Sequence, residues 1–109
     1  MSTFVLVHGA WHGGWCWRDV AVRLSAAGHD VFTPTLSGLG ERAHLAQWPI
    51  DLGTHISDIE NVVAFEELDE IRLFGHSYGG IVISGVAERI APRINHLVYL
   101  DAIVPLHGK

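Results

Sequence analysis

A serine between two glycines stands at the centre of residues 72–81, which read RLFGHSYGGI. Ser77 follows Gly75 by two residues and precedes Gly79 by two. This G-x-S-x-G spacing is typical of a nucleophile elbow, a strained strand-to-helix turn that lifts a serine hydroxyl above the edge of a sheet. Side chains at the two glycine positions would collide with neighbouring backbone in such a turn. The pattern predicts a nucleophilic Ser77, whereas a serine that only caps the following helix is the alternative.

The rest of the chain reads as the scaffold for this turn. Apolar runs predict four strands, at residues 4–7, 30–35, 71–74 and 96–101. Apolar residues at helical spacing predict helices over about 16–27, from a cap at Thr54 through Val63, and after Ser77 as far as Pro92. Residues 36–53 show no period and are expected to form a long loop. Alternating strands and helices predict an α/β fold, a three-layer sandwich with a parallel sheet.

Three of the polar positions fall where strands end. His8 follows the first predicted strand, Ser77 follows the third, and Asp101 ends the fourth. Ligand chemistry in parallel sheets gathers at the carboxyl ends of the strands. We therefore expect these residues at one edge of the sheet.

Composition limits the partners. The 109 residues are 49% hydrophobic with a net charge of −5, which fits one globular domain over residues 1–109. No run of lysine or arginine exists, so we expect neither a nucleic-acid partner nor a membrane partner. The histidines show no metal-ligand spacing, so no metal and no cofactor are expected. A single cysteine, Cys16, cannot form an internal disulfide and favours a cytoplasmic location.

Three segments together resemble a known family. They are residues 4–15 (FVLVHGAWHGGW), 75–80 (GHSYGG) and 97–102 (LVYLDA). They resemble the α/β-hydrolase family, in the branch of methyl-salicylate esterases, hydroxynitrile lyases and bacterial esterase-like relatives. The resemblance implies that the four strands are the third to sixth of an eight-stranded sheet, in the local order 2-1-3-4. It also implies that residues 1–109 are the N-terminal half of an α/β-hydrolase.

The same resemblance implies roles for individual residues. Ser77 would attack a small-molecule carboxylic ester, and the backbone N–H groups of Tyr78 and Ala10 would form the oxyanion hole. Trp11 beside this loop is the better candidate for the substrate pocket, whereas Trp15 and Trp17 could line the pocket or pack in the core. The lyases of the branch carry a polar residue where this chain has Gly9, which favours an esterase.

A serine nucleophile needs a histidine base and an acid, which follow it in this fold in the order Ser, acid, His. After Ser77 the chain offers only Glu88 and Asp101 as acids, and His96 and His107 as histidines. Glu88 is expected inside a helix, and His96 is expected at the start of the last strand, at the end of the sheet opposite Ser77. Asp101 is a candidate acid, but the family takes its histidine from beyond the eighth strand. We therefore expect the catalytic histidine and the acid to be missing, and the chain alone to be inactive or very weak.

Two other expectations complete the sequence-based hypothesis. A last strand at the edge of the sheet would expose unpaired backbone, which predicts a homo-oligomer joined through residues 97–101 or 102–106. The alternatives to a hydrolase are a non-catalytic binding remnant of the same fold, and a hydroxynitrile lyase or cofactor-free peroxidase. The remaining histidines, including His55 and His76, are expected to be solvated, locally bonded or packed.

Overall fold

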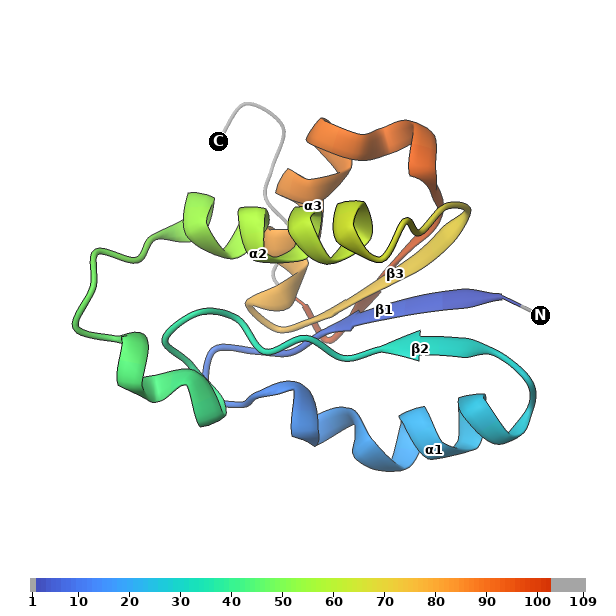
Figure 1. The fold of residues 1–109 in the computed structure, drawn as a ribbon, viewed down its shortest axis with the longest axis horizontal. Coiled ribbons are helices and arrows are strands. Elements are labelled where there is room, and N and C mark those ends of the chain that lie inside the picture. Colours follow the sequence, from blue (N-terminus) through green and yellow to red (C-terminus); the bar gives the residue numbers. More distant parts are fainter. Residues whose placement is uncertain (1, 103–109) are drawn as a thin grey trace.

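The computed structural model describes residues 2–102 as a parallel sheet between two layers of helices (Figure 1). The strands are β1 (Thr3–Val7), β2 (Asp30–Phe32), β3 (Ile71–His76) and β4 (Ile94–Leu100). All pair in parallel, in the order β2-β1-β3-β4. Helix α1 (Arg18–Ala26) covers one face, and α2 (Leu52–Phe65) and α3 (Gly79–Ile90) cover the other. The α/β class, the three layers and the strand order 2-1-3-4 are confirmed.

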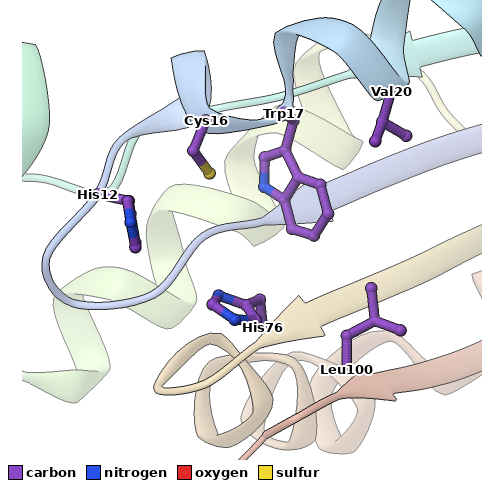
Figure 2. A pocket seen from close by; sticks show the side chains of 6 residues that line it. All are labelled: His12, Cys16, Trp17, Val20, His76 and Leu100. Atoms are coloured by element: carbon purple, nitrogen blue, oxygen red, sulfur yellow. The ribbon is translucent and has the colours of Figure 1, made fainter.

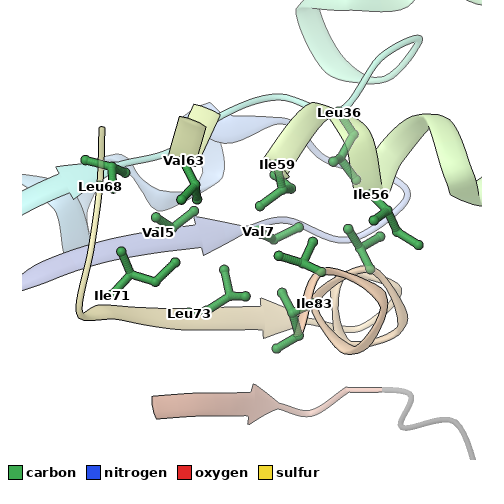
Figure 3. Close-up of a cluster of buried hydrophobic side chains, with 12 residues drawn as sticks. Val5, Val7, Leu36, Ile56, Ile59, Val63, Leu68, Ile71, Leu73 and Ile83 are labelled. Atoms are coloured by element: carbon green, nitrogen blue, oxygen red, sulfur yellow. The ribbon is translucent and has the colours of Figure 1, made fainter. Parts of the chain in front are cut away.

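The larger hydrophobic core lies between the sheet and helices α2 and α3 (Figure 3). Alternate residues of a strand point to opposite faces, so Val5 and Val7 face this core while Phe4 and Leu6 face α1. The remaining fully or nearly fully buried members are Leu36, Ile56, Ile59, Val63, Leu68, Ile71, Leu73, Val82, Ile83 and Val86. Burial of β1 on both faces explains its continuous apolar sequence.

The first helical segment differs from the single helix expected over residues 16–27. A 3₁₀ helix, η1 (Gly14–Trp17), precedes α1, and α1 itself contains no fully buried residue. A Cβ at Gly14 would overlap the Thr33 carbonyl oxygen, so this turn packs directly against the segment after β2. Of the two tryptophans that could pack in the core, Trp17 is buried and Trp15 is half exposed. Cys16, between them, is also exposed.

The long loop after β2 ends in a different cap from the one expected. The cap of α2 is Asp51, whose Oδ1 accepts a hydrogen bond from the Thr54 N–H at 3.0 Å. The Thr54 hydroxyl accepts one from the Asp51 N–H at 3.2 Å, which completes a capping box. Within the loop lies a second 3₁₀ helix, η2 (Gly40–Leu45). A 3₁₀ helix has three residues per turn, which explains why the sequence of this segment shows no α-helical periodicity.

Candidate active site

Ser77 occupies the bend between β3 and α3, as the sequence predicts. Its φ angle is +55°, in the left-handed region that a serine rarely adopts. The Ser77 N–H donates to the Leu100 carbonyl at 3.4 Å, so the bend lies beside the carboxyl end of β4. The side chain is half-buried rather than enclosed in the core. A strained backbone at an accessible hydroxyl is the geometry that a nucleophile elbow requires.

The two glycines around Ser77 are required by close backbone contacts. A Cβ at Gly75 would lie 2.5 Å from the Gly79 carbonyl oxygen. A Cβ at Gly79 would lie 2.6 Å from the Val7 carbonyl oxygen and 2.9 Å from that of His8. The bend thus brings the start of α3 against the end of β1. Any larger residue at either position would push these backbones apart.

The loop after β1 lies directly beside Ser77. A Cβ at Gly9 would lie 3.2 Å from the Ser77 Cβ and 3.4 Å from the His76 carbonyl oxygen. Ala10 follows in this loop and is half-buried, and Tyr78 follows Ser77 in the elbow. The structure therefore brings Ser77, Ala10 and Tyr78 to one edge of the sheet. Backbone amides at such an edge suit a developing negative oxygen.

His8 stabilises the loop after β1 through hydrogen bonds made in the protein interior. The side chain is fully buried, with Nδ1 2.6 Å from the Gly9 carbonyl oxygen and Nε2 2.9 Å from the Leu36 nitrogen. The Leu36 N–H donates, so Nε2 accepts and Nδ1 carries the proton that it donates to Gly9. Burial lowers the pKa of His8 below the usual 6.5, although its bond to Gly9 opposes this. His8 is therefore a neutral support.

This lowered pKa predicts a loss of stability in acid. The unfolded chain binds a proton at His8 more readily than the folded protein does. The contribution of His8 to the free energy of unfolding is therefore complete above pH 6.5. It is lost as the pH falls from that value through the lower folded pKa. We expect the free energy of unfolding in urea to fall less in His8→Gln than in the parent between about pH 7.5 and about pH 5. The exposed His44→Gln is the control, and equal falls in all three proteins would contradict the prediction.

A shallow groove of about 320 Å³ lies beside the elbow on the α1 side of the sheet (Figure 2). Its lining consists of His12, Cys16, Trp17, Val20, His76 and Leu100. The imidazole rings of His12 and His76 lie 6.1 Å apart between centroids. Trp11, the expected pocket residue, is not among the lining residues and is 93% exposed. The loop that holds Ala10 turns the Trp11 ring outward, and the structure brings Trp17 to the groove instead.

The candidate acids and bases differ in how close they lie to the edge of the sheet that holds Ser77. Asp101 follows β4 with a φ of +46° and is exposed, at the same edge as Ser77. Glu88 is exposed on α3, as expected. His96 lies in β4 and pairs with Arg72 near the start of β3, away from the elbow, as expected. His107 lies outside the described residues.

Within the described residues 2–102, no side chain forms a hydrogen bond with the Ser77 hydroxyl. No group of three or more metal-ligating side chains occurs in the same range. Nor does this part of the chain contain a helix long and apolar enough to cross a membrane.

His55 is the residue that the sequence-based expectations missed. It is buried in α2 and contacts the elbow, with Nδ1 2.7 Å from the Tyr78 hydroxyl oxygen. Its Nε2 lies 2.9 Å from the Ser37 carbonyl oxygen, in the segment after β2. The signal was present, because residues 55, 59 and 63 recur at intervals of four and place His55 on the same helix face as Ile59 and Val63.

Taken together, the sheet, the bend at Ser77 and the adjoining loop define an α/β protein whose strand-to-helix bend has the geometry of a nucleophile elbow. The comparison with known families agrees. The chain belongs to the alpha/beta hydrolase family, whose profile matches residues 4–108.

The proteins to which the chain is similar include esterases and a hydroxynitrile lyase. The chain is 62% identical to the carbendazim hydrolyzing esterase of Nocardioides sp. (strain SG-4G), over 99% of this chain and 45% of that protein. It is 38% identical to an alpha-hydroxynitrile lyase of Arabidopsis thaliana, over 94% of this chain and 40% of the relative. These relatives confirm the resemblance to the branch of esterases and hydroxynitrile lyases.

A solved structure confirms the fold. It is described as an extracellular alpha/beta-hydrolase from Paenibacillus species with structural and functional homology to tobacco salicylic acid binding protein 2. It superimposes with a TM-score of 0.89 at 32% identity, over 100% of this chain and 44% of that one. The chain thus spans less than half the length of the relatives that it matches.

Proposed function

We propose that this chain carries the nucleophile and the oxyanion hole of a carboxylic-ester hydrolase for small or medium esters. The observation that carries the proposal is the left-handed backbone of Ser77 with Gly9 packed against its Cβ. This arrangement places the Ser77 Cβ beside the loop that contains Ala10. The relative named as a carbendazim hydrolyzing esterase, at 62% identity, supports an ester-type substrate.

In the proposed reaction, the Ser77 oxygen attacks the carbonyl carbon of the ester. The carbonyl oxygen becomes negative and accepts hydrogen bonds from the Ala10 and Tyr78 amides. Preorganised donors of this kind contribute about 3 to 4 kcal/mol each to the stability of such a transition state. The alcohol then leaves, and water cleaves the acyl group from Ser77.

Removal of the Ser77 proton requires a general base, since a neutral serine is a weak nucleophile. We propose that the histidine base lies outside the described residues and that Asp101 is only a candidate for the acid. Residues 1–109 by themselves would then hydrolyse esters very weakly or not at all. Nitrophenyl acetate turnover well above background, and abolished by Ser77→Ala, would contradict this part of the proposal.

A fluorophosphonate probe tests the nucleophile without requiring turnover. The Ser77 oxygen bonds to phosphorus, the P–F bond breaks, and the serine proton passes to the buffer. We expect peptide mapping by mass spectrometry to find a single slow adduct at Ser77. An absent adduct, or an equal yield at Ser37 and Ser84, would favour the alternative, a non-catalytic binding protein of the same fold.

A lyase is the second candidate, because one relative is an alpha-hydroxynitrile lyase at 38% identity. The resemblance implies that the lyases of the branch carry a polar residue where this chain has Gly9. Here a Cβ at that position would lie 3.2 Å from the Ser77 Cβ, which is tighter than nine in ten real Cβ contacts. The site therefore favours an esterase, and an assay of cyanohydrin cleavage decides between the two.

We also propose that copies of the chain associate through β4. This strand lies at the edge of the described sheet, and its Leu97 and Leu100 are 37% and 39% exposed. Unpaired edge backbone with apolar side chains favours pairing with another strand. We expect sedimentation at micromolar concentration to show dimers or larger species, and Leu97→Lys to shift them toward monomer. A parent that sediments as a monomer would contradict the proposal.

A further inference from the structure

Two buried histidines connect the ends of three strands beneath the proposed oxyanion hole. His8 extends from the end of β1 to Leu36, and His55 extends from α2 to Ser37 and Tyr78. Neither imidazole takes part in the reaction proposed above. Both are enclosed in the protein and make two hydrogen bonds each. Because both ring nitrogens of each buried histidine have a hydrogen-bond partner, the two side chains are suited to a positioning role.

His8 acts on the Ala10 amide through the peptide group that it contacts. The Gly9 carbonyl and the Ala10 N–H belong to one rigid, planar peptide unit. The Gly9 oxygen accepts from His8 Nδ1 at 2.6 Å and from the His12 N–H at 3.2 Å. Two donors on one carbonyl fix the plane of this peptide. The direction of the Ala10 N–H is fixed with it.

His55 contacts the side chain of Tyr78, the residue that carries the second proposed amide. The Ser37 carbonyl can only accept a hydrogen bond, so His55 Nε2 donates to it. In the neutral imidazole, Nδ1 then accepts the Tyr78 hydroxyl proton. Burial raises the pKa of Tyr78 above its usual 10, so the phenol keeps this proton. The ring of Tyr78 packs edge-on against His55, with centroids 5.6 Å apart.

Both contacts rest on the same short segment after β2. His8 accepts from the N–H of Leu36, and His55 donates to the carbonyl of the next residue, Ser37. Asp58, one turn after His55 in α2, accepts from the Ser37 N–H at 2.7 Å and from its hydroxyl at 2.8 Å. The support beneath the two amides is therefore one connected set of hydrogen bonds.

We propose that His8 and His55 are positioning residues that hold the two oxyanion-hole amides, of Ala10 and Tyr78, in fixed relative directions through opposite tautomers. The inference rests on the proposed function of these amides. It requires the proton of His8 to be on Nδ1 and the proton of His55 to be on Nε2. It also requires the hydrogen bond from Tyr78 to restrict the motion of its own backbone N–H.

The direct test is nuclear magnetic resonance of the 109-residue chain. Long-range ¹H–¹⁵N correlations of the imidazoles are expected to show Nδ1–H for His8 and Nε2–H for His55. The order parameter of the Tyr78 N–H is expected to fall from about 0.85 toward about 0.6 in Tyr78→Phe. The same tautomer in both histidines, or an unchanged order parameter, would overturn the inference.

Matched variants separate positioning from general loss of structure. Tyr99→Phe also removes a partly buried tyrosine hydroxyl, which lies 2.6 Å from the Ser84 hydroxyl oxygen, but it is expected to leave the Tyr78 order parameter unchanged. His55→Gln keeps a donor and an acceptor, so it is expected to retain the order that His55→Leu loses. Equal losses in Tyr99→Phe and Tyr78→Phe would overturn the inference.

Reaction with the fluorophosphonate gives the functional readout. Tyr78→Phe is expected to slow phosphonylation of Ser77 about 10-fold or more, whereas Tyr99→Phe reacts at the parent rate. An unchanged rate in Tyr78→Phe would overturn the inference. If the parent does not react at all, the proposed function fails, while the tautomers and order parameters still decide the positioning role.

Discussion

Ser77→Gly is expected to abolish reaction with fluorophosphonate and yet to leave the protein more stable than Ser77→Ala does. Both variants lose the hydroxyl. Alanine keeps the cost of a φ of +55°, whereas glycine adopts this backbone without strain. We expect a difference of about 1 kcal/mol in the free energy of unfolding, with glycine the more stable. Urea unfolding of the two variants measures it.

Ser84 is the matched control, because it lies inside helix α3. There glycine is expected to be less stable than alanine by about 1 kcal/mol. Both variants of this residue lose the same bonds to Gly80 and Tyr99, so these bonds do not affect the comparison. The same sign at Ser77 and Ser84 would mean that the elbow is not strained.

The largest effect on stability is expected from Gly79→Ala. The new Cβ would lie 2.6 Å and 2.9 Å from two carbonyl oxygens of the first strand and its loop, which belong to the backbone and cannot turn away. We expect a loss of about 3 kcal/mol or more, the upper end of the range for overpacked sites. Gly75→Ala, with its Cβ 2.5 Å from a carbonyl oxygen, is expected to behave alike. Thermal or urea unfolding measures both.

Gly53→Ala provides the comparison within α2. Its Cβ would meet only the end of the exposed Asp51 side chain, at 3.2 Å. Alanine favours the helix over glycine by up to about 1 kcal/mol, so this variant is expected to be neutral or more stable. A loss at Gly79 no larger than the change at Gly53 would contradict the packing described for the elbow.

The parts of the fold that the sequence predicts are those with strong local signals. The strand over residues 4–7 is apolar because both of its faces are buried, and the bend at Ser77 is marked by glycines that contacts require. By contrast, residues 16–27 are expected as one helix, but Gly14 is packed against Thr33 and the segment begins in a 3₁₀ turn over Gly14–Trp17. That contact joins residues far apart in the sequence, so no local sequence pattern predicts it.

In the candidate site, too, local motifs are predictable from the sequence and contacts between distant residues are not. Ser77, Ala10 and Tyr78 follow from motifs, and the structure brings them together at one edge. The contacts of His55 depend on how α2 packs over the sheet, so its bond to Tyr78 is visible only in three dimensions. Trp11 was expected in a pocket because it neighbours Ala10, but adjacency in sequence does not determine which way a loop side chain points.

The structure of the protein after reaction with a fluorophosphonate tests the central claim most directly. Crystals of the adduct are expected to show phosphorus bonded to the Ser77 oxygen. A phosphonyl oxygen should lie about 2.7 to 3.1 Å from the backbone nitrogens of both Ala10 and Tyr78. An adduct whose oxygens contact neither amide, or a protein that forms no adduct at Ser77, would contradict the account.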